Sequence, residues 1–233
     1  MRRTTTTERI NERVDELIDQ FDECVNFFNS TKKFTGPSLY FHLKTINMHN
    51  NKRPIELVAD DLFLDYVYAT LASWGMHRMG ESDTKLNEYY QFCKSINDEK
   101  NWIEKIQGYQ IDLIQDDHTE FVINSIFQII SRLKIGIGET KVVVGSKTLH
   151  HILPNLVPPI DGEYTMRFFY GNRTTALNQG EDVFFSEIFP YFIKIAKMRQ
   201  KNISQFIGTG MNTSKTKVVD NAIVGYCDLY LRK

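Results

Sequence analysis

The sequence is poor in the residues that build metal and disulfide sites. Its 233 residues include three cysteines, Cys24, Cys93 and Cys227, which lie far apart and form no Cys-x-x-Cys pair. This number and spacing argue against a disulfide framework, a zinc–thiolate site and an iron–sulfur cluster, and they fit a reducing compartment. We therefore expect a cytoplasmic protein with no disulfide-linked partner.

Long hydrophobic runs and an excess of one charge are also lacking. No apolar stretch approaches the roughly 18 residues that a membrane span needs, and residues 1–20 are basic and then polar, without the apolar segment of a signal peptide. We therefore expect no membrane partner. The net charge of −1 argues against a dedicated nucleic-acid coat protein, although it leaves room for a local basic patch.

The composition that remains is that of a globular helical protein. Hydrophobic residues make up 42% of the chain and charged residues 24%, which is enough apolar surface for a packed core. We find no repeat, low-complexity tract or linker. The sequence predicts one compact all-α, multi-helix domain over residues 1–233, with a flexible tail at 1–7 and two lobes around a cleft as a possible arrangement.

Apolar residues at three- and four-residue steps predict the helices, as in the stripe that begins with Ile10, Val14 and Leu17. The predicted ranges are 8–29, 36–43, 56–73, 83–96, 99–115, 118–134, 143–153, 162–170, 181–201 and 213–232. The helix over 118–134 is apolar on more than one side, so we expect it to be the central buried helix.

Two N-terminal caps are predicted from residue types. Asp117 and Glu120 have the spacing of a capping box at the start of the helix over 118–134. Ser82 or Asp83 is expected to cap the helix that ends near Ile96.

The most unusual segment runs from Gly136 to Gly171 and combines glycine turns, prolines, lysines and a histidine pair. Gly136 and Gly138 permit either a left-handed helix C-cap or a turn whose exposed N–H groups bind phosphate. Asp161 follows Pro158 and Pro159, which restrict its position, and it is either an N-cap or a functional carboxylate.

Part of this segment resembles the helix-hairpin-helix DNA glycosylases, which carry a Gly-x-Gly hairpin followed by an apolar Val-Pro segment that ends in a catalytic Asp. The sequence GIGETK at 136–141 resembles the hairpin, and VPPID at 157–161 resembles the approach to the carboxylate. The resemblance implies that Asp161 stabilises positive charge on a sugar or activates a nucleophile, and that Lys141 or Lys147 supplies an amine. The proline usual before the hairpin is missing, and the spacing to Asp161 is longer.

A second resemblance covers most of the chain. The phrases GPSLYFH at 36–42, ASWGMHRMG at 72–80 and GSKTLHHILPNLVPPIDGEYTMRFF at 145–169 are similar to those of a family of uncharacterised microbial proteins. This resemblance implies no activity.

The three phrases and the hairpin segment together contain side chains that are unusual for a plain helical core. Cationic groups suit phosphate and aromatic rings suit a stacked base, so convergence of these residues would form a nucleic-acid or nucleotide site. The candidate catalytic residues are Asp161, Lys147 and Lys141, and the candidate binding residues are Tyr40, His42, Trp74, His77, Arg78, Gly136, Gly138, His150, Tyr164 and Arg167.

Three functions remain open from the sequence. The first is a DNA glycosylase-like protein that binds nucleic acid, with Asp161 as its central carboxylate. The second is a non-catalytic helical module that binds a protein or small ligand. The third is a metal-dependent enzyme that uses His42, His77, His150 or His151 with Asp161, although no His-x-x-x-His spacing exists and adjacent histidines on a helix point apart. We predict no cofactor.

Overall fold

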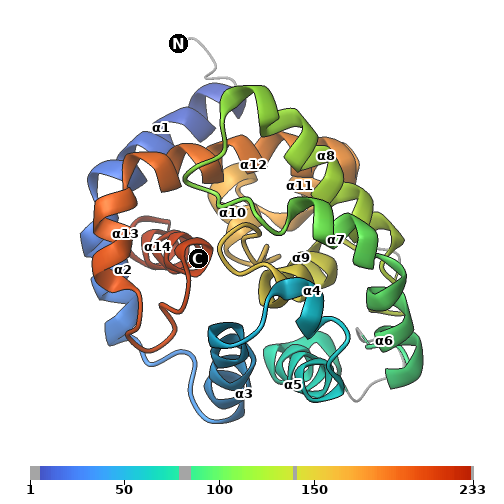
Figure 1. Cartoon of the computed structure of the whole chain (residues 1–233). Helices are drawn as coiled ribbons and strands as arrows, with labels where there is room; N and C mark the ends of the chain where they lie inside the picture. Colours follow the sequence, from blue (N-terminus) through green and yellow to red (C-terminus); the bar gives the residue numbers. More distant parts are fainter. Residues whose placement is uncertain (1–5, 79–84, 139–140, 232–233) are drawn as a thin grey trace.

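The computed structural model describes residues 6–78, 85–138 and 141–231. Helices fill most of these ranges, and the described residues contain only two isolated β-bridges and no sheet (Figure 1). The prediction of a compact all-α fold is therefore confirmed. Among the described residues, no helix is both long and apolar enough to cross a membrane.

The helices pack in two groups. The first joins the two ends of the chain and consists of α1 (Thr6–Asp19), α2 (Phe21–Ser30), α10 (Thr165–Tyr170), α11 (Arg173–Leu177), α12 (Glu181–Met198), α13 (Gln200–Phe206) and α14 (Lys215–Tyr230). The second consists of α3 (Pro37–Asn47), η1 (Met48–Asn50), α4 (Pro54–Leu57), α5 (Asp61–Leu71), η2 (Ala72–Met76), α6 (Tyr89–Asp98), α7 (Lys100–Ile106), α8 (Asp116–Arg132) and α9 (Val142–Ile152). Helices α8 and α12 pack across the two groups, and one hydrophobic core runs through both.

The central buried helix is α14 rather than the segment over 118–134. Every residue of α14 from Thr216 to Cys227 is buried, whereas α8 leaves Phe121 exposed. Figure 1 shows the red α14 beside the blue α2, its most extensive neighbour. Gly225 permits this close approach, because a Cβ at this position would lie 2.0 Å from the carbonyl oxygen of Cys24.

Helix faces follow the predicted periodicity, but several boundaries differ. The first helix is two helices, α1 and α2, which meet at Gln20, and no proline or glycine marks this break. The predicted apolar stripe is nevertheless buried. The fifth helix ends at Ile106 rather than near residue 115, just before Gly108. The predicted loop over 171–180 contains the short α11.

Of the two predicted N-terminal caps, one does not form and the other lies outside the described residues. The capping box does not form, because α8 begins at Asp116 and its N-cap, Gln115, makes no side-chain cap bond. Ser82 and Asp83 lie outside the described residues, and α6 begins only at Tyr89. The chain just before α6 is extended because Leu86 pairs with Gly136 in an antiparallel bridge.

Candidate functional site

A small charged cavity lies where the two helix groups meet. Its volume is about 80 Å³, smaller than the roughly 300–1,000 Å³ of typical small-molecule sites. The lining residues are Phe34, Trp74, Lys147, Pro159, Asp161, Tyr164, Lys217, Asp220 and Val224. Two lysines, two aspartates and three aromatic rings therefore face one space, which we call the inner cavity.

Helix α9 carries Lys147 into the inner cavity. The absence of a side chain at Gly145 lets α9 approach α8 closely, since a Cβ there would lie 2.9 Å from Cγ2 of Ile130. Only 6% of Lys147 is exposed. A buried ammonium group needs an anionic or hydrogen-bonding partner, and Nζ of Lys147 donates to Oδ2 of Asp161 at 3.0 Å.

The Pro-Pro segment holds Asp161 in place opposite Lys147. The backbone N–H of Ile160 donates to Oγ of Ser146 at 3.0 Å, and that of Asp161 donates to Oγ1 of Thr165 at 3.0 Å. Oδ1 of Asp161 accepts from the backbone N–H groups of Glu163 and Tyr164 at 2.7 and 3.1 Å. Asp161 is thus a turn cap through one oxygen and the partner of Lys147 through the other.

The pKa of Asp161 lies below its usual value. Burial alone would raise this pKa, but the charge of Lys147, its hydrogen bond and the two backbone N–H groups outweigh the effect of burial. Asp161 is therefore ionised at neutral pH. Its side chain is 32% exposed, so the ion pair is accessible from solvent on this side.

A second ion pair lines the same cavity, and the sequence interpretation missed it. Nζ of Lys217 donates to Oδ2 of Asp220 at 2.5 Å, and the two side chains are only 2% and 5% exposed. Burial raises the pKa of Asp220, and the nearby Lys217 only partly opposes this effect. The available signal is a Lys and an Asp three residues apart in α14, a spacing that an ion pair on a solvated helix face shares.

Three aromatic rings close the inner cavity. Phe34 and Trp74 have ring centroids 6.3 Å apart, and Nζ of Lys217 lies 5.3 Å and 5.2 Å from these two centroids. Nε1 of Trp74 donates to the carbonyl of Ser38 at 3.1 Å, which fixes the indole. Tyr164 is held by Nζ of Lys33, which donates to its hydroxyl at 2.6 Å.

A chain of buried histidines lies behind Trp74. Nδ1 of His151 lies 2.7 Å from the carbonyl of Lys147, an acceptor only, so this nitrogen carries the proton. Nε2 of His151 then accepts from Nδ1 of His42 at 3.1 Å, and Nε2 of His42 accepts from the hydroxyl of Thr213 at 2.7 Å. Burial lowers the pKa of His42, His150 and His151, so all three are neutral at pH 7.

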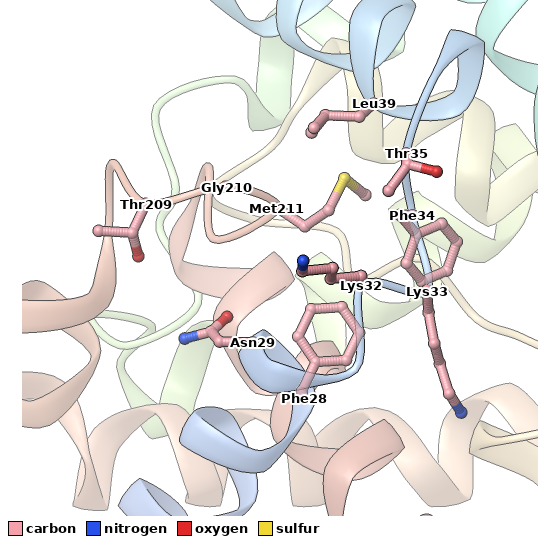
Figure 2. Close-up of a pocket in the computed structure, with 10 residues that line it drawn as sticks. All are labelled: Phe28, Asn29, Lys32, Lys33, Phe34, Thr35, Leu39, Thr209, Gly210 and Met211. Atoms are coloured by element: carbon pink, nitrogen blue, oxygen red, sulfur yellow. The ribbon is translucent and has the colours of Figure 1, made fainter.

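A larger pocket adjoins the inner cavity, and Phe34 lines both. Figure 2 shows this outer pocket, whose volume is about 350 Å³. Phe28, Leu39 and Met211 supply apolar walls, and the Lys32 side chain extends across the pocket. The rest of its lining consists of Asn29, Lys33, Thr35, Thr209 and Gly210.

The structure brings together only some of the predicted residues. Lys147, Asp161, Trp74 and Tyr164 line the inner cavity, and His42 contacts Trp74 with ring centroids 5.2 Å apart. Four other predicted residues, His150, Tyr40, His77 and Arg78, do not line the cavity. His150 is buried with its Nδ1 directed at the carbonyl of Val157, Tyr40 is exposed on α3, and the exposed His77 accepts from the N–H of Leu86. Arg78 is exposed as well.

Arg167 contacts Tyr164 but does not itself line the inner cavity. Its guanidinium carbon is 5.3 Å from the ring centroid of Tyr164, on the α10 side. Nε and Nη2 of Arg167 are buried and have no hydrogen-bond partner among the described residues.

The glycine hairpin differs from both interpretations drawn from the sequence. Neither Gly136 nor Gly138 has a positive φ, so neither forms a left-handed C-cap. The N–H groups at the start of α9 are also occupied, because the Glu181 carboxylate accepts from Lys141 at 3.0 Å and from Val142 at 2.8 Å. Glu181 thus takes the place that a phosphate would occupy, and Glu139 and Thr140 lie outside the described residues.

Lys141 does not reach Asp161. Its Nζ donates to the carbonyl of Ser131 at 2.6 Å at the exposed end of α9. Of the two candidate amines, Lys147 is therefore the one that the fold places beside the carboxylate. Within the ranges that the structure describes, no three His, Cys, Asp or Glu side chains are grouped so that they could hold a metal ion.

Comparisons with family models, with curated proteins and with solved structures found no match. Inferences about function therefore rest on the geometry of the inner cavity. That geometry can hold a polar group that both donates and accepts hydrogen bonds, and it places an amine beside an ionised carboxylate.

Proposed function

We propose that this protein binds nucleic acid and acts like a DNA glycosylase on a nucleotide whose sugar reaches the inner cavity, with Asp161 as the central carboxylate. The observation that carries the proposal is the contact of 3.0 Å between Nζ of Lys147 and Oδ2 of Asp161. An amine and an ionised carboxylate held together in a partly enclosed space are the two groups that this reaction uses.

Each group has a defined part in this proposal. When the bond between C1′ and the base breaks, positive charge develops on the sugar, and the ionised Asp161 stabilises that charge. Lys147 gives up a proton and forms a bond from Nζ to C1′, while the base leaves with the electrons of the broken bond and gains a proton. The low pKa of Asp161 supports its role as the charged partner.

The surroundings of the pair support a nucleotide ligand. Trp74, Phe34 and Tyr164 give the cavity an aromatic lining against which a base can pack. The outer pocket adds Lys32, an exposed ammonium group in the space that adjoins Phe34, where a phosphate of the same strand fits. The inner cavity, at about 80 Å³, is too small for a whole nucleotide, so the C1′ side of the sugar would enter it beside Lys147 and Asp161 while the rest of the ligand extends into the outer pocket.

Oligonucleotides that carry single damaged or non-standard bases test this proposal. We expect the protein to bind them at low salt and to release the free base from at least one of them. Asp161→Asn is the informative variant because the amide oxygen can still cap the turn at Glu163 and Tyr164 while the charge is lost. This variant is expected to bind but to lose cleavage by about 100-fold or more.

Two outcomes would contradict the proposal. One is the absence of binding at low salt by the wild-type protein. The other is full retention of function by Asp161→Asn, which the alternative of a non-catalytic binding module predicts, since Oδ1 of Asp161 would then matter only as a cap. Lys141→Gln is the matched control, because Lys141 lies away from the cavity and its loss should leave cleavage unchanged.

A further inference from the structure

The outer pocket carries positive charge and has no acidic side chain in its lining. Two lysines, Lys32 and Lys33, line it, and no aspartate or glutamate does. The Lys33 ammonium group is already engaged, because it binds the carboxylate of Asp228 and the hydroxyl of Tyr164. Lys32 has no ion pair or hydrogen bond among the described residues, and Figure 2 shows its side chain across the pocket. One uncompensated positive charge therefore faces this space.

Lys32 holds this place in an unfavourable backbone conformation. Its φ is 49°, and no other non-glycine residue in the described ranges has a positive φ. The position directly follows the end of α2, where glycine is common because it adopts a left-handed conformation without strain. A glycine here would relax the turn but would leave the pocket without its free ammonium group.

The other walls of the outer pocket are largely apolar. Phe28 and Met211 belong to one hydrophobic cluster, and Phe34 and Leu39 pack against it. Phe34 and Leu39 are only partly buried, so a ligand with a short apolar group can remove more of their surface from water. The volume of about 350 Å³ lies at the lower end of the range for small-molecule sites, which indicates a small ligand.

Hydrogen bonds between distant segments hold the pocket walls together. Nδ2 of the fully buried Asn212 donates to Oδ1 of Asn29 at 2.9 Å, and this bond ties the loop over 209–211 to the end of α2. Nδ2 of Asn221, in α14, donates to Oδ1 of Asn212 at 2.7 Å. The pocket is thus formed before a ligand arrives, which reduces the entropy lost on binding.

We propose that the outer pocket binds a monocarboxylate with a short apolar tail. The carboxylate accepts from Nζ of Lys32, and the tail lies against Leu39 and Phe34. One free ammonium group matches one negative charge, which favours a carboxylate over a phosphate dianion. This inference goes beyond the proposed function, in which Lys32 meets a phosphate of a strand, because the carboxylate binds without nucleic acid.

Three small molecules test the two parts of the proposed ligand. Hexanoate has the charge and the tail, acetate has the charge alone, and hexan-1-ol has the tail alone. Ligand-observed NMR at millimolar concentrations measures the affinity of each for the wild-type protein. We expect hexanoate to bind at least about 10-fold more tightly than either of the others, because each buried methylene contributes up to about fourfold and a charge-assisted hydrogen bond about tenfold.

Methionine methyl signals show where hexanoate binds. Met211 lines the outer pocket, whereas Met198, on α12, is 59% exposed and does not line it. In protein labelled with ¹³C at the methionine methyl groups, hexanoate should shift the Met211 signal and leave the Met198 signal in place. Met211→Leu and Met198→Leu identify the two signals.

Substitutions at Lys32 separate ligand binding from stability. Lys32→Gly removes the ammonium group and relaxes the turn, so hexanoate should bind at least about 10-fold more weakly while the melting temperature is no lower than that of the wild type. Lys32→Asn is the second variant, because asparagine also tolerates a positive φ. Lys201→Gln is the control, since Lys201 is an exposed lysine on α13 that does not line the pocket, and it should keep the wild-type affinity.

The outcomes keep this inference distinct from the glycosylase proposal. The site is overturned if hexanoate does not bind, if acetate or hexan-1-ol binds equally well, if the Met211 signal does not move, or if both Lys32 variants keep the wild-type affinity. Hexanoate binding at Lys32 by a protein that neither binds nor cleaves oligonucleotides supports the site and contradicts the glycosylase proposal. Cleavage by a protein that does not bind hexanoate does the reverse.

Discussion

Nζ of Lys147 lies 3.0 Å from Oδ2 of Asp161, and these two atoms link helix α9 to the turn before α10. Lys147→Met should lower the free energy of unfolding by about 2–4 kcal/mol, because Asp161 is then left partly buried without its counter-charge. Urea unfolding measures this change. The double variant Lys147→Met with Asp161→Asn should be less destabilised than the sum of the two single variants. Strict additivity would contradict a direct interaction.

The buried histidines predict a strong pH dependence of stability. The pKa values of His42, His49 and His150 are lowered, and that of His151 falls to about 3, with burial as the main cause in each. Below pH ~6.5 these histidines take up protons in the unfolded chain but not in the folded one. Above pH ~6.5 these histidines therefore do not lower the free energy of unfolding. Below that pH, each histidine lowers the free energy of unfolding by about 1.4 kcal/mol per pH unit until the pH reaches the pKa of that histidine in the folded state.

Two aspartates modify this profile in opposite directions. The lowered pKa of Asp161 adds a loss of stability only below its usual pKa, whereas the raised pKa of Asp220 makes protonation of the folded state favourable and offsets part of the loss. Urea midpoints between pH 7.5 and 5 measure the combined slope. His151→Gln should reduce that slope, and substitution of the exposed His118 should not. A flat profile over this range would contradict buried neutral histidines.

The close contact between α2 and α14 predicts that a larger residue at position 225 destabilises the protein. In Gly225→Ala the new Cβ would lie 2.0 Å from the carbonyl oxygen of Cys24, and because backbone atoms cannot move away cheaply, the helices must separate. We expect a loss of about 3 kcal/mol or more in the free energy of unfolding, measured by urea denaturation. Gly108→Ala, with no atom within 4 Å of the new Cβ, should change it by less than about 0.5 kcal/mol. Equal effects would contradict the close approach.

The position of the Glu181 carboxylate predicts that an anion can bind at the start of α9 once this carboxylate is removed. Its carboxylate accepts from the N–H groups of Lys141 and Val142, so Glu181→Ala should cost about 1 kcal/mol and leave those groups without this partner. Sulfate should then raise the melting temperature of the variant more than that of the wild type. Glu120→Ala, on the exposed side of α8, serves as the control. An identical response to sulfate in all three proteins would contradict this role.

The sequence predicts helix faces well because burial follows periodicity. Ile10, Val14 and Leu17 lie in the core as their spacing requires, although the break at Gln20 has no local signal. The segment with Pro158 and Pro159 also points correctly to Asp161 as a restrained carboxylate. Local chemistry decides both features, so both are visible in the sequence.

The remaining features depend on contacts between distant segments. Lys217 and Asp220 form an ion pair in a helix that is buried on all sides, and no periodicity distinguishes such a pair from one on a solvated face. Likewise, Glu181 lies 40 residues from Lys141, so only the fold shows that the predicted phosphate cradle is already filled. The prediction for Tyr40 and Arg78 rests on residue type and on their place in the phrases at 36–42 and 72–80, and the fold leaves both exposed and outside the inner cavity lining.

Covalent trapping tests the central claim most directly. The wild-type protein is incubated with an oligonucleotide that contains an abasic site, sodium borohydride is added, and the cross-linked peptide is identified by mass spectrometry. The proposed role of the amine beside Asp161 predicts a reduced adduct on Nζ of Lys147 that is lost in Lys147→Gln and kept in Lys141→Gln. No adduct, or an adduct on a lysine outside the inner cavity, would contradict the account.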